Sequence, residues 1–382
     1  MPAFRTPSLL LTGRGTIEQI GSEAKKLGGS RILILTDKGI KAAGLADFVQ
    51  GLLEGEGLAV EICAEVEPEP PIESFEHCLQ VAREGQFDLF IGLGGGSSMD
   101  MAKSVSVMMT NPGSVQDYFG VDKVQQLGLP KIAVPTTAGT GSEVTPIAIL
   151  TDTAKQLKIG VVSPYLIPDV SIVDPQMTET MPPHVTAATG MDALTHAIES
   201  YTSLKANPLT DALAIQAIIL IARSLRTAVA NGADQAARED MALGSLLAGM
   251  SFANASVTAT HALAFPLGGK FDLPHGVANG LMLPYVMEFN CVGNLVKFAH
   301  IARLLGERTE GLSLRQAAIQ AAKSVRSLEK DIGVPQRLRE VNVPEEAIPE
   351  LAAGAFTVTR ILQNNPRHMT LEDIEAIYRQ AF

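Results

Sequence analysis

The sequence has few cysteines and no long apolar segment, and both shortages restrict the class of protein it can encode. The three cysteines, Cys63, Cys78 and Cys291, are odd in number and widely spaced, so they form neither a disulfide framework nor a metal cluster. No run of about 18 uncharged apolar residues occurs, and the first residues, Met-Pro-Ala-Phe-Arg, lack the apolar core of a signal peptide. We therefore expect a protein of the reducing cytoplasm that neither enters a membrane nor is exported.

Basic residues are also scarce. Lys and Arg number 30 against 41 Asp and Glu, which gives a formal net charge of −11. Because an acidic surface repels a phosphate backbone and no basic stretch exceeds Lys25-Lys26, the sequence predicts no nucleic-acid partner. Hydrophobic residues make up 46% of the chain and charged residues 19%, a balance typical of globular proteins, and the length of 382 residues indicates two domains.

The apolar pattern changes near residue 180. Before it, β-branched runs alternate with helical stretches, which is typical of a parallel sheet covered by helices. We expect strands at 31–36, 58–63, 88–92, 131–135, 147–150, 158–162 and 170–173, and helices at 39–54, 73–84 and 98–110. Beyond it we expect helices at 184–202, 208–230, 235–254, 257–264, 276–288, 294–305, 313–330, 345–353 and 371–381.

The predicted fold is thus an α/β N-terminal domain over residues 1–180, with a Rossmann-like parallel sheet, followed by an all-α helical C-terminal domain over residues 181–382. No low-complexity linker separates the halves, so we expect them to pack closely with a cleft between them. Such clefts are common ligand sites.

A glycine-rich loop follows one of the predicted strands. Gly94, Gly95 and Gly96 precede Ser97 and Ser98 at the start of a helix. Glycines let a ligand approach the backbone, and a helix N-terminus favours a phosphate. The fingerprint G-x-G-x-x-G is not met, because a serine occupies its last position, and a tight turn without a ligand explains the same residues.

A second polar loop, PTTAGTGSEVTP at 135–146, follows the next strand and carries the hydroxyls of Thr136, Thr137 and Thr145 among others. Hydroxyls can bind phosphate, ribose or a carboxamide, although Ser and Thr are also common turn residues. Because ligands of open α/β sheets bind at the carboxyl ends of the strands, the two loops predict a nucleotide site there. Asp37, just past the first strand, fits either a helix N-cap or an acceptor from a ribose 2′-OH.

Only seven histidines occur, and three of them accompany an aspartate in the helical half. Asp192 and His196 are four residues apart, so both face one side of a helix. His261 lies in an apolar stretch and His275 in a loop before the next helix. One carboxylate and three imidazoles suit a divalent first-row metal. The structural alternatives are an N-cap for Asp192, core residues for His196 and His261, and a turn residue for His275.

Four ordered motifs resemble those of a known family. They are GGGSSMDMAK (94–103), PTTAGTGSEVT (135–145), AATGMDALTHAIESY (187–201) and HALAFPLGGKFDLPHGVANGLMLPYVMEFN (261–290), with NPR at 365–367. Over essentially its whole length the chain resembles the iron-containing (group III) alcohol dehydrogenases. The resemblance implies a metal-dependent, NAD(P)-linked enzyme that transfers hydride reversibly between an alcohol and its aldehyde or ketone.

The resemblance also implies roles for particular residues. The metal, Fe²⁺ ahead of Zn²⁺, would be bound in the C-terminal domain by Asp192, His196, His261 and His275, of which His261 and His275 are also the expected catalytic residues. The cofactor, NAD in preference to NADP, would contact the N-terminal domain. Its expected contacts are Asp37 at the adenosine ribose and Gly94, Gly95, Gly96, Ser97, Ser98, Thr136, Thr137, Thr145 and Lys158.

Two positions depart from the family pattern. Many members carry a further histidine four residues after the third metal ligand, where this chain has Phe265. Many also have an asparagine in a Pro-Asn-Pro setting, where this chain has Glu69 between two prolines. The first departure bears on any histidine proton relay, and the second on that cofactor contact.

Two alternatives stay open at this point. One is another enzyme of the same superfamily, either a polyol dehydrogenase or a dehydroquinate-synthase-like lyase. The other is a non-catalytic nucleotide-binding scaffold. The expected partners are a small alcohol or aldehyde and further copies of the chain, as a homodimer or larger homo-oligomer, with neither nucleic acid nor membrane.

Overall fold

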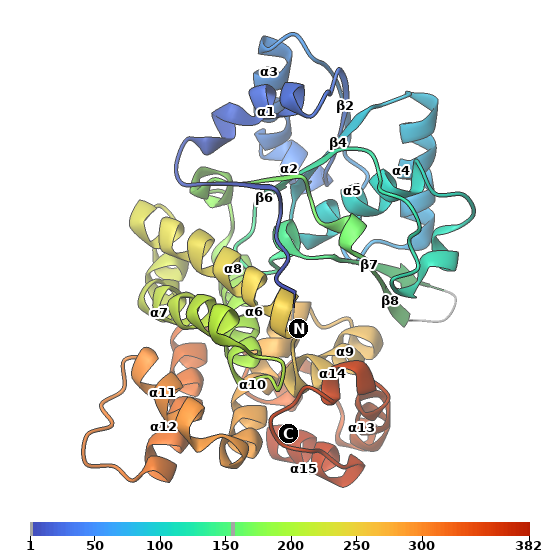
Figure 1. Ribbon diagram of the computed structural model, residues 1–382. Coiled ribbons are helices and arrows are strands. Elements are labelled where there is room, and N and C mark those ends of the chain that lie inside the picture. Colours follow the sequence, from blue (N-terminus) through green and yellow to red (C-terminus); the bar gives the residue numbers. More distant parts are fainter. Residues whose placement is uncertain (1–2, 154–156) are drawn as a thin grey trace. The chain divides into compact units, whose positions relative to one another are not determined.

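The computed structural model describes residues 3–153 and 157–382. The chain forms two compact units, residues 1–181 and residues 182–382. The first is built from strands and helices, and the second, over the residues described, from helices alone (Figure 1). The predicted fold class, an α/β N-terminal part followed by a helical C-terminal part, is confirmed.

A six-stranded parallel sheet forms the centre of the first unit, with the strand order β1-β9-β6-β4-β2-β3. Its strands are β1 (Leu9–Thr12), β2 (Arg31–Leu35), β3 (Ala59–Cys63), β4 (Leu89–Gly94), β6 (Lys131–Pro135) and β9 (Val170–Val173). The sequence analysis missed β1, a four-residue edge strand that is only partly buried. Because β2, β4 and β6 are parallel neighbours, the loops that follow them leave the same edge of the sheet.

Helices cover both faces of this sheet (Figure 1). Side chains of β2 alternate between two cores, Leu33 and Leu35 on one face and Ile32 and Ile34 on the other, as the period of a strand requires. The helices are α1 (Ile20–Lys26), α2 (Lys38–Ala42), α3 (Leu45–Gly55), α4 (Ile72–Glu84) and α5 (Gly96–Met108). Residues of α4 and α5 join the first core and residues of α1 and α3 the second. The single helix expected at 39–54 is wrong, since Gly44 adopts a left-handed φ of 79° and separates α2 from α3.

A smaller sheet of three strands lies beside the main one. It consists of β5 (Gly120–Val121), β7 (Ile147–Asp152) and β8 (Leu157–Val162) in the order β5-β8-β7. We expected β7 and β8 in the parallel sheet, but they pair antiparallel. Their short connection explains the difference, because parallel neighbours need a crossover of about a dozen residues or more.

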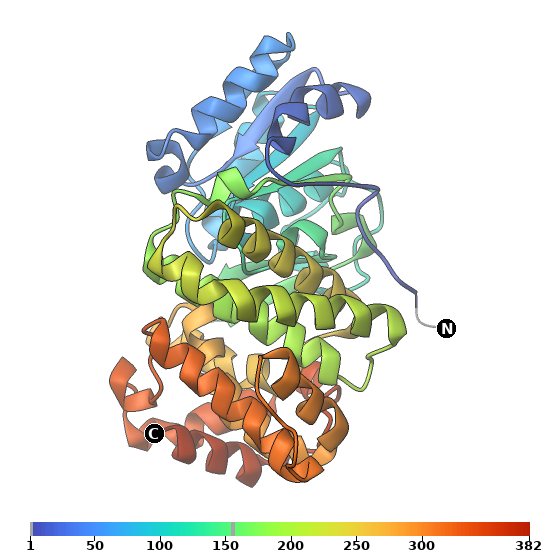
Figure 2. The same ribbon diagram turned by 90° about the vertical axis from the view of Figure 1, so that its left-hand side faces the viewer.

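The second unit is a bundle in which α7 and α8 pack on α6, and α10 packs on α6, α9, α12 and α15 (Figures 1 and 2). Its helices are α6 (Pro183–Thr202), α7 (Pro208–Ala230), α8 (Gln235–Ala255), α9 (Ala259–Phe271), α10 (His275–Asn290), α11 (Leu295–Leu304), α12 (Leu314–Asp331), α13 (Ile348–Phe356), α14 (Thr359–Leu362) and α15 (Leu371–Ala381). The short α14 was not expected. In the described part of the chain, α7 is the single unbroken helix long and apolar enough to cross a membrane. It packs on α6 and α8, so its apolar side chains serve the core of the bundle.

Two helix boundaries in this unit bear on the site. The helix expected at 257–264 runs on through Pro266 to Phe271, because Leu263 and Leu267, on either side of the proline, both pack in one core. His275 is the first residue of α10 and not a loop residue. Asp192 lies in the interior of α6, so its interpretation as an N-cap is wrong.

Gly276, the second residue of α10, marks a close approach to α6. A Cβ atom at this position would lie 2.2 Å from the carbonyl oxygen of Ala188, which is backbone and cannot move aside. We predict that Gly276→Ala lowers the free energy of unfolding by about 1–3 kcal/mol, the usual cost of overpacking, as measured by urea denaturation.

Gly51 provides the matched control. It is a glycine inside α3, and apart from its chain neighbours and the backbone of its own helix, no atom lies within 4 Å of the place that a Cβ atom would occupy there. Gly51→Ala should therefore be neutral or stabilising by up to about 1 kcal/mol. Equal stability of Gly276→Ala and the unchanged protein would contradict the close contact.

Candidate metal centre and cofactor edge

The predicted metal ligands of the second unit come together. Asp192 and His196 are buried on one face of α6, with 4.0 Å between Asp192 Oδ2 and His196 Nδ1. His261 Nε2 and His275 Nε2 lie 3.9 Å and 3.7 Å from Asp192 Oδ1. One ligand atom from each of Asp192, His261 and His275 lies within 4.8 Å of the others. His196 joins this group through His261, with 3.0 Å between their Nε2 atoms.

The distances and donor types suit a divalent cation. Two nitrogen ligands that each lie about 2.1 Å from one ion are roughly 3.0–3.4 Å apart, depending on the coordination angle. Burial raises the pKa of the Asp192 carboxyl, but the neighbouring charges of His196, His275 and His261 and a hydrogen bond from Asn279 outweigh burial, so the pKa lies below its ordinary value. The aspartate is therefore an ionised acceptor, as a metal ligand must be.

Asn279, which the sequence analysis did not single out, points its amide nitrogen at the same place. Its Nδ2 lies 2.7 Å from Asp192 Oδ1, 3.1 Å from His261 Nε2 and 3.0 Å from His275 Nε2. Its Oδ1 is buried and has no hydrogen-bond partner among the residues described. The two N–H groups of this amide can serve only two of the three atoms at a time, but the short distances show that the three atoms surround one point. The spacing of four residues from His275 along α10 was the available sequence signal.

Glu199 is a second buried carboxylate on α6 that the sequence analysis missed. It lies seven residues after Asp192, two helical turns along the same face. His261 Nδ1 lies 2.6 Å from Glu199 Oε2. Burial raises the pKa of the Glu199 carboxyl, but hydrogen bonds from His261 and Thr258 outweigh burial and bring it below its ordinary value.

Phe265 borders the same group. Its ring is stacked on the imidazole of His275 with 6.0 Å between the ring centroids, and it meets His261 edge-on at 6.4 Å. Its other contacts are with the core formed by α9, α10, α13 and α15, and it is partly buried. The ring therefore presents an apolar surface beside two of the candidate ligands.

In the first unit, the loops after β2, β4 and β6 converge. Gly94 O accepts a hydrogen bond from Thr136 N at 2.9 Å. A Cβ atom on Gly94 would lie 3.6 Å from Asp37 Oδ2, and one on Gly96 would lie 3.1 Å from the Thr140 side chain. The three loops thus meet here, and Gly96 leaves little room for a side chain against the loop after β6.

Hydroxyl groups at this edge are left without partners. Ser98, Thr136 and Thr137 have buried hydroxyl oxygens with no hydrogen bond among the described residues. The helix α5 begins there. Its N-cap is Gly95, which has no side chain, so the first turn of α5 receives no side-chain cap. Because buried polar groups are normally paired, this arrangement suits a polar, anionic ligand.

Asp37 has a structural task at the same edge. Its Oδ1 accepts from Gly39 N at 2.8 Å and Ile40 N at 3.0 Å, so it is the N-cap of α2. The N-cap interpretation is confirmed. The second carboxylate oxygen, Oδ2, is the one that faces Gly94.

Thr145 and the residues around it form a buried polar network that the sequence analysis did not foresee. Lys103 of α5 is buried, and its Nζ donates to Ser142 Oγ at 2.6 Å, Thr145 Oγ1 at 3.1 Å and the Ile147 carbonyl at 2.7 Å. Asp100 accepts from Ile149 N at 2.9 Å. Lys103 therefore fastens the second loop to α5, and Thr145 is held inside this network.

Lys158 and Ser97 meet Glu69. The Lys158 ammonium forms an ion pair with the Glu69 carboxylate, and Glu69 N donates to Ser97 Oγ at 3.1 Å. Glu69 adopts a φ of 51°, a left-handed conformation that asparagine tolerates better. The departure from the family pattern at residue 69 thus places a carboxylate on Lys158.

Both halves of the chain match descriptions of one family. Residues 7–175 match the family described as "Iron-containing alcohol dehydrogenase". Residues 186–382 match "Fe-containing alcohol dehydrogenase family, C-terminal". The chain belongs to the iron-containing alcohol dehydrogenases.

Relatives and solved structures agree over the full length of the chain. Long-chain-alcohol dehydrogenase 1 of Geobacillus thermodenitrificans (strain NG80-2) is 46% identical over 98% of this chain and 95% of its own. The crystal structure of a 1,3-propanediol oxidoreductase, 44% identical, superposes with a TM-score of 0.98 and full coverage of both chains. Sulfoacetaldehyde reductase from Bifidobacterium kashiwanohense in complex with NAD⁺ is 32% identical, with a TM-score of 0.91 and coverage of 100% and 98%. This iron-containing alcohol dehydrogenase is therefore an oxidoreductase that acts on alcohols, and the lyase and scaffold alternatives lose their basis.

Proposed function

We propose that the protein is an NAD-linked, metal-dependent alcohol dehydrogenase that prefers alcohols with an apolar portion. The observation that carries the proposal is the convergence of Asp192, His261 and His275, whose ligand atoms lie within 4.8 Å of one another, with His196 against His261. One carboxylate with imidazoles is a donor set for a divalent first-row metal. These four residues are the proposed ligands.

The chain supplies donors and their environment, while the bound groups supply the reactive chemistry. A divalent metal held by these residues would supply Lewis-acid polarisation of an alcohol oxygen, and a bound nicotinamide would supply the hydride acceptor. Asp192 offsets part of the cation's charge. A metal held there would be bound by the lone pairs of the neutral forms of the His196, His261 and His275 imidazoles. Burial of Asp192, His196 and His261 keeps water from that side, which strengthens charge interactions.

Fe²⁺ is the proposed natural metal. The support is that the family descriptions matching both halves of the chain specify iron. The donor set would also hold Zn²⁺. Metal analysis of protein purified without added metal distinguishes the two, and zinc at one ion per chain would overturn this part of the proposal.

NAD is the proposed cofactor, with its phosphates at the N-terminus of α5 and the hydroxyls of Ser98, Thr136 and Thr137. Support comes from the unpartnered hydroxyls and from the NAD⁺ complex of a relative with 32% identity. Gly94, Gly95, Gly96 and Ser97 form the turn from β4 into α5, and we propose that their backbone also contacts the cofactor. Thr145 contributes by holding its loop through Lys103. Lys158, which is paired with Glu69, is the remaining residue that would contact the cofactor.

The substrate preference follows from Phe265. A phenyl ring stacked on His275 offers neither a proton nor a hydrogen bond, so this wall of the site is apolar. A relative with 46% identity is named a long-chain-alcohol dehydrogenase, which supports the same preference. Proton release then falls to water or to a hydroxyl of substrate or cofactor.

Two further parts of the proposal concern the cellular compartment and the oligomeric state of the enzyme. The three cysteines are free and buried, which suits a reducing compartment, and we propose a cytoplasmic enzyme. The homo-oligomer stays a prediction from the sequence, and light scattering of the purified chain measures it.

The metal ligands are tested by His275→Ala. We expect bound metal to fall from one ion per chain toward zero. Alcohol oxidation, followed by the absorbance of NADH, should fall at least about 100-fold, because removing only the hydrogen-bond partner of a metal ligand already lowers affinity or activity about 10- to 100-fold. The control is His184→Ala, which removes an exposed histidine of α6 and should change neither quantity. Full activity and metal content in His275→Ala, or no oxidation of any alcohol by the metal-loaded unchanged enzyme, would overturn the proposal.

The cofactor preference is tested at Asp37. An ionised carboxylate repels the 2′-phosphate of NADP, so Asp37→Gly and Asp37→Ser should both raise the kcat/KM ratio of NADP to NAD by about tenfold or more. Serine keeps the N-cap of α2, so only Asp37→Gly should also lose stability. Equal efficiency with both cofactors in the unchanged enzyme, or an unaltered ratio in Asp37→Ser, would contradict this role.

The substrate preference is tested at Phe265. We expect the unchanged enzyme to oxidise 1-hexanol with a higher kcat/KM than 1,3-propanediol. Phe265→Leu should keep most of that ratio. Phe265→Asn should reduce it about tenfold, because a small change in a hydrophobic pocket alters the discrimination between two substrates by about 1–3 kcal/mol. If both variants lost thermal stability while the ratio stayed the same, Phe265 would be a core residue without a role in specificity.

A further inference from the structure

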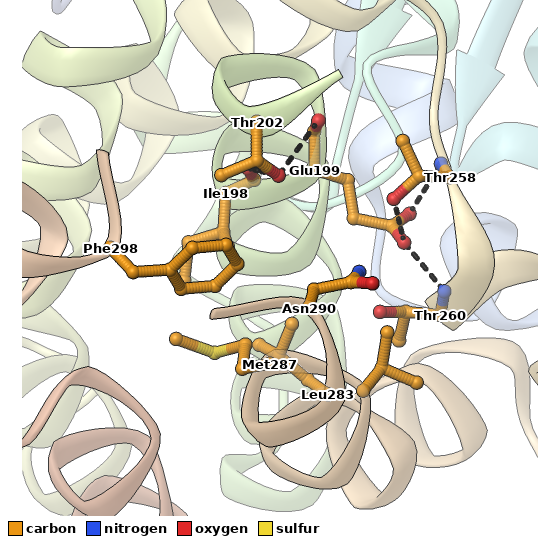
Figure 3. Close-up of a pocket in the computed structure, with 10 residues that line it drawn as sticks. Ile198, Glu199, Thr202, Thr258, Thr260, Leu283, Met287, Asn290 and Phe298 are labelled. Atoms are coloured by element: carbon orange, nitrogen blue, oxygen red, sulfur yellow. Dashed lines mark hydrogen bonds between the residues drawn. The ribbon is translucent and has the colours of Figure 1, made fainter. Parts of the chain in front are cut away.

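Glu199 is surrounded by donors from one short segment of the chain. Its Oε1 accepts from Thr258 Oγ1 at 2.7 Å and Thr260 N at 2.6 Å, and its Oε2 accepts from Thr258 N at 3.1 Å. The fourth donor is His261 Nδ1 at 2.6 Å from Oε2. Figure 3 shows the carboxylate of α6 reaching toward Thr258 and Thr260 at the start of α9. The carboxylate is therefore tied to the helix that carries His261.

The surroundings of Glu199 hold it in one place. Glu199 is 2% exposed. Its ion pair is with His261, and no Lys or Arg in the described part of the chain forms one with it. A small cavity of about 10 Å³, enough for about one water, lies beside it and is lined by Thr260, Met287, Asn290 and Phe298 among others (Figure 3). The N-cap residue Thr258 makes no side-chain bond to the first turn of α9. Glu199 thus takes over the capping of α9 from a neighbouring helix.

The contacts on the two ring nitrogens of His261 determine its protonation pattern. Both oxygens of the Glu199 carboxylate already accept from backbone N–H groups, as an acceptor-only carboxylate does, so the contact with His261 is made by an Nδ1–H donor. A neutral imidazole has a single N–H, so Nε2 presents its lone pair. The second side of the ring is compatible with this, because the two groups that reach Nε2, Asn279 Nδ2 at 3.1 Å and His196 Nε2 at 3.0 Å, can both donate to it. Asn279 Nδ2 also lies 2.7 Å from the acceptor Asp192 Oδ1, which fixes it as the donor end of the amide.

We propose that Glu199 is a positioning residue that holds His261 as the Nδ1–H tautomer, and that the metal affinity of the enzyme depends on this contact. The inference rests on the metal centre of the proposed function, and it adds a residue that touches neither metal nor substrate. A carboxylate behind a ligating imidazole fixes its tautomer and orientation and raises its basicity. The competing interpretation is that Glu199 only caps α9.

Glu199→Gln separates these interpretations. The glutamine amide keeps the shape of the side chain. Thr260 N makes the shorter of the two backbone hydrogen bonds to Glu199, at 2.6 Å, so we expect the amide oxygen of the glutamine to remain on that side. The NH₂ group then faces His261 Nδ1. The imidazole must then accept at Nδ1 and carry its hydrogen on Nε2, where a metal ligand needs a lone pair.

The first readout is the tautomer itself, in the metal-free full-length protein, from the ¹⁵N chemical shifts of His261. We expect the protonated nitrogen to be Nδ1 in the unchanged chain and Nε2 in Glu199→Gln. The second readout is Co²⁺ affinity, measured by competition with a chelator, which should fall about 10- to 100-fold in Glu199→Gln. Glu199→Asp keeps an acceptor-only carboxylate and should recover the Nδ1–H tautomer and most of the affinity.

Thr258→Val is the matched control. It removes one hydrogen bond to Glu199 and leaves the contact with His261 in place, so stability should fall while tautomer and Co²⁺ affinity stay within about threefold of the unchanged protein. If Glu199→Gln lost stability in the same way but kept tautomer and affinity, Glu199 would be a cap and the inference would be wrong.

Failure of the proposed function looks different. If the unchanged protein bound no Co²⁺ at all, the metal centre would be wrong. The tautomer measurement in the metal-free chain would still test Glu199. If Glu199→Gln did not fold, a loss of the Nδ1–H signal in folded Glu199→Asp would overturn the inference, and its retention together with near-normal Co²⁺ affinity would support it.

Discussion

The second unit depends on the burial of two carboxylates on one helix. Asp192 and Glu199 are both withdrawn from water on α6, and a buried charge without partners costs several kcal/mol or more. The partners come from α10 for Asp192, through Asn279, and from the start of α9 for Glu199. Satisfying these charges therefore holds α9 and α10 against α6, and the same contacts aim the imidazoles of His261 and His275 at Asp192.

The first unit follows the same principle with a charge of opposite sign. Lys103 is a buried cation on α5, and burial lowers the pKa of its ammonium while the charge and hydrogen bond of Asp100 act against that change. Its acceptors lie in the loop after β6 and at the start of β7. A lysine beside a glycine-rich loop is readily interpreted as a phosphate ligand, but here its ammonium is engaged in holding the loops together.

Local sequence features predicted the elements well where packing agreed with them. The period of the apolar residues placed α7 and α15 at their observed bounds, and β6 and β9 likewise. The predictions were wrong where neighbours decided the outcome. The partner of β7 is β8 and not a strand of the main sheet, and α9 continues past Pro266 because apolar residues on both sides of the proline are needed in one core.

By itself the sequence determined the local parts of the site. A glycine-rich turn leading from a strand into α5 and the pairing of Asp192 with His196 on one helical face follow from spacing, since helix pitch and turn geometry act over a few residues. Only the tertiary structure decided which distant groups meet. His261 lies 62 residues from Glu199 and 65 from His196, and Lys103 lies 42 residues from Thr145. Such contacts arise when whole helices and loops pack to shield buried charges, and no local pattern in the chain carries that information.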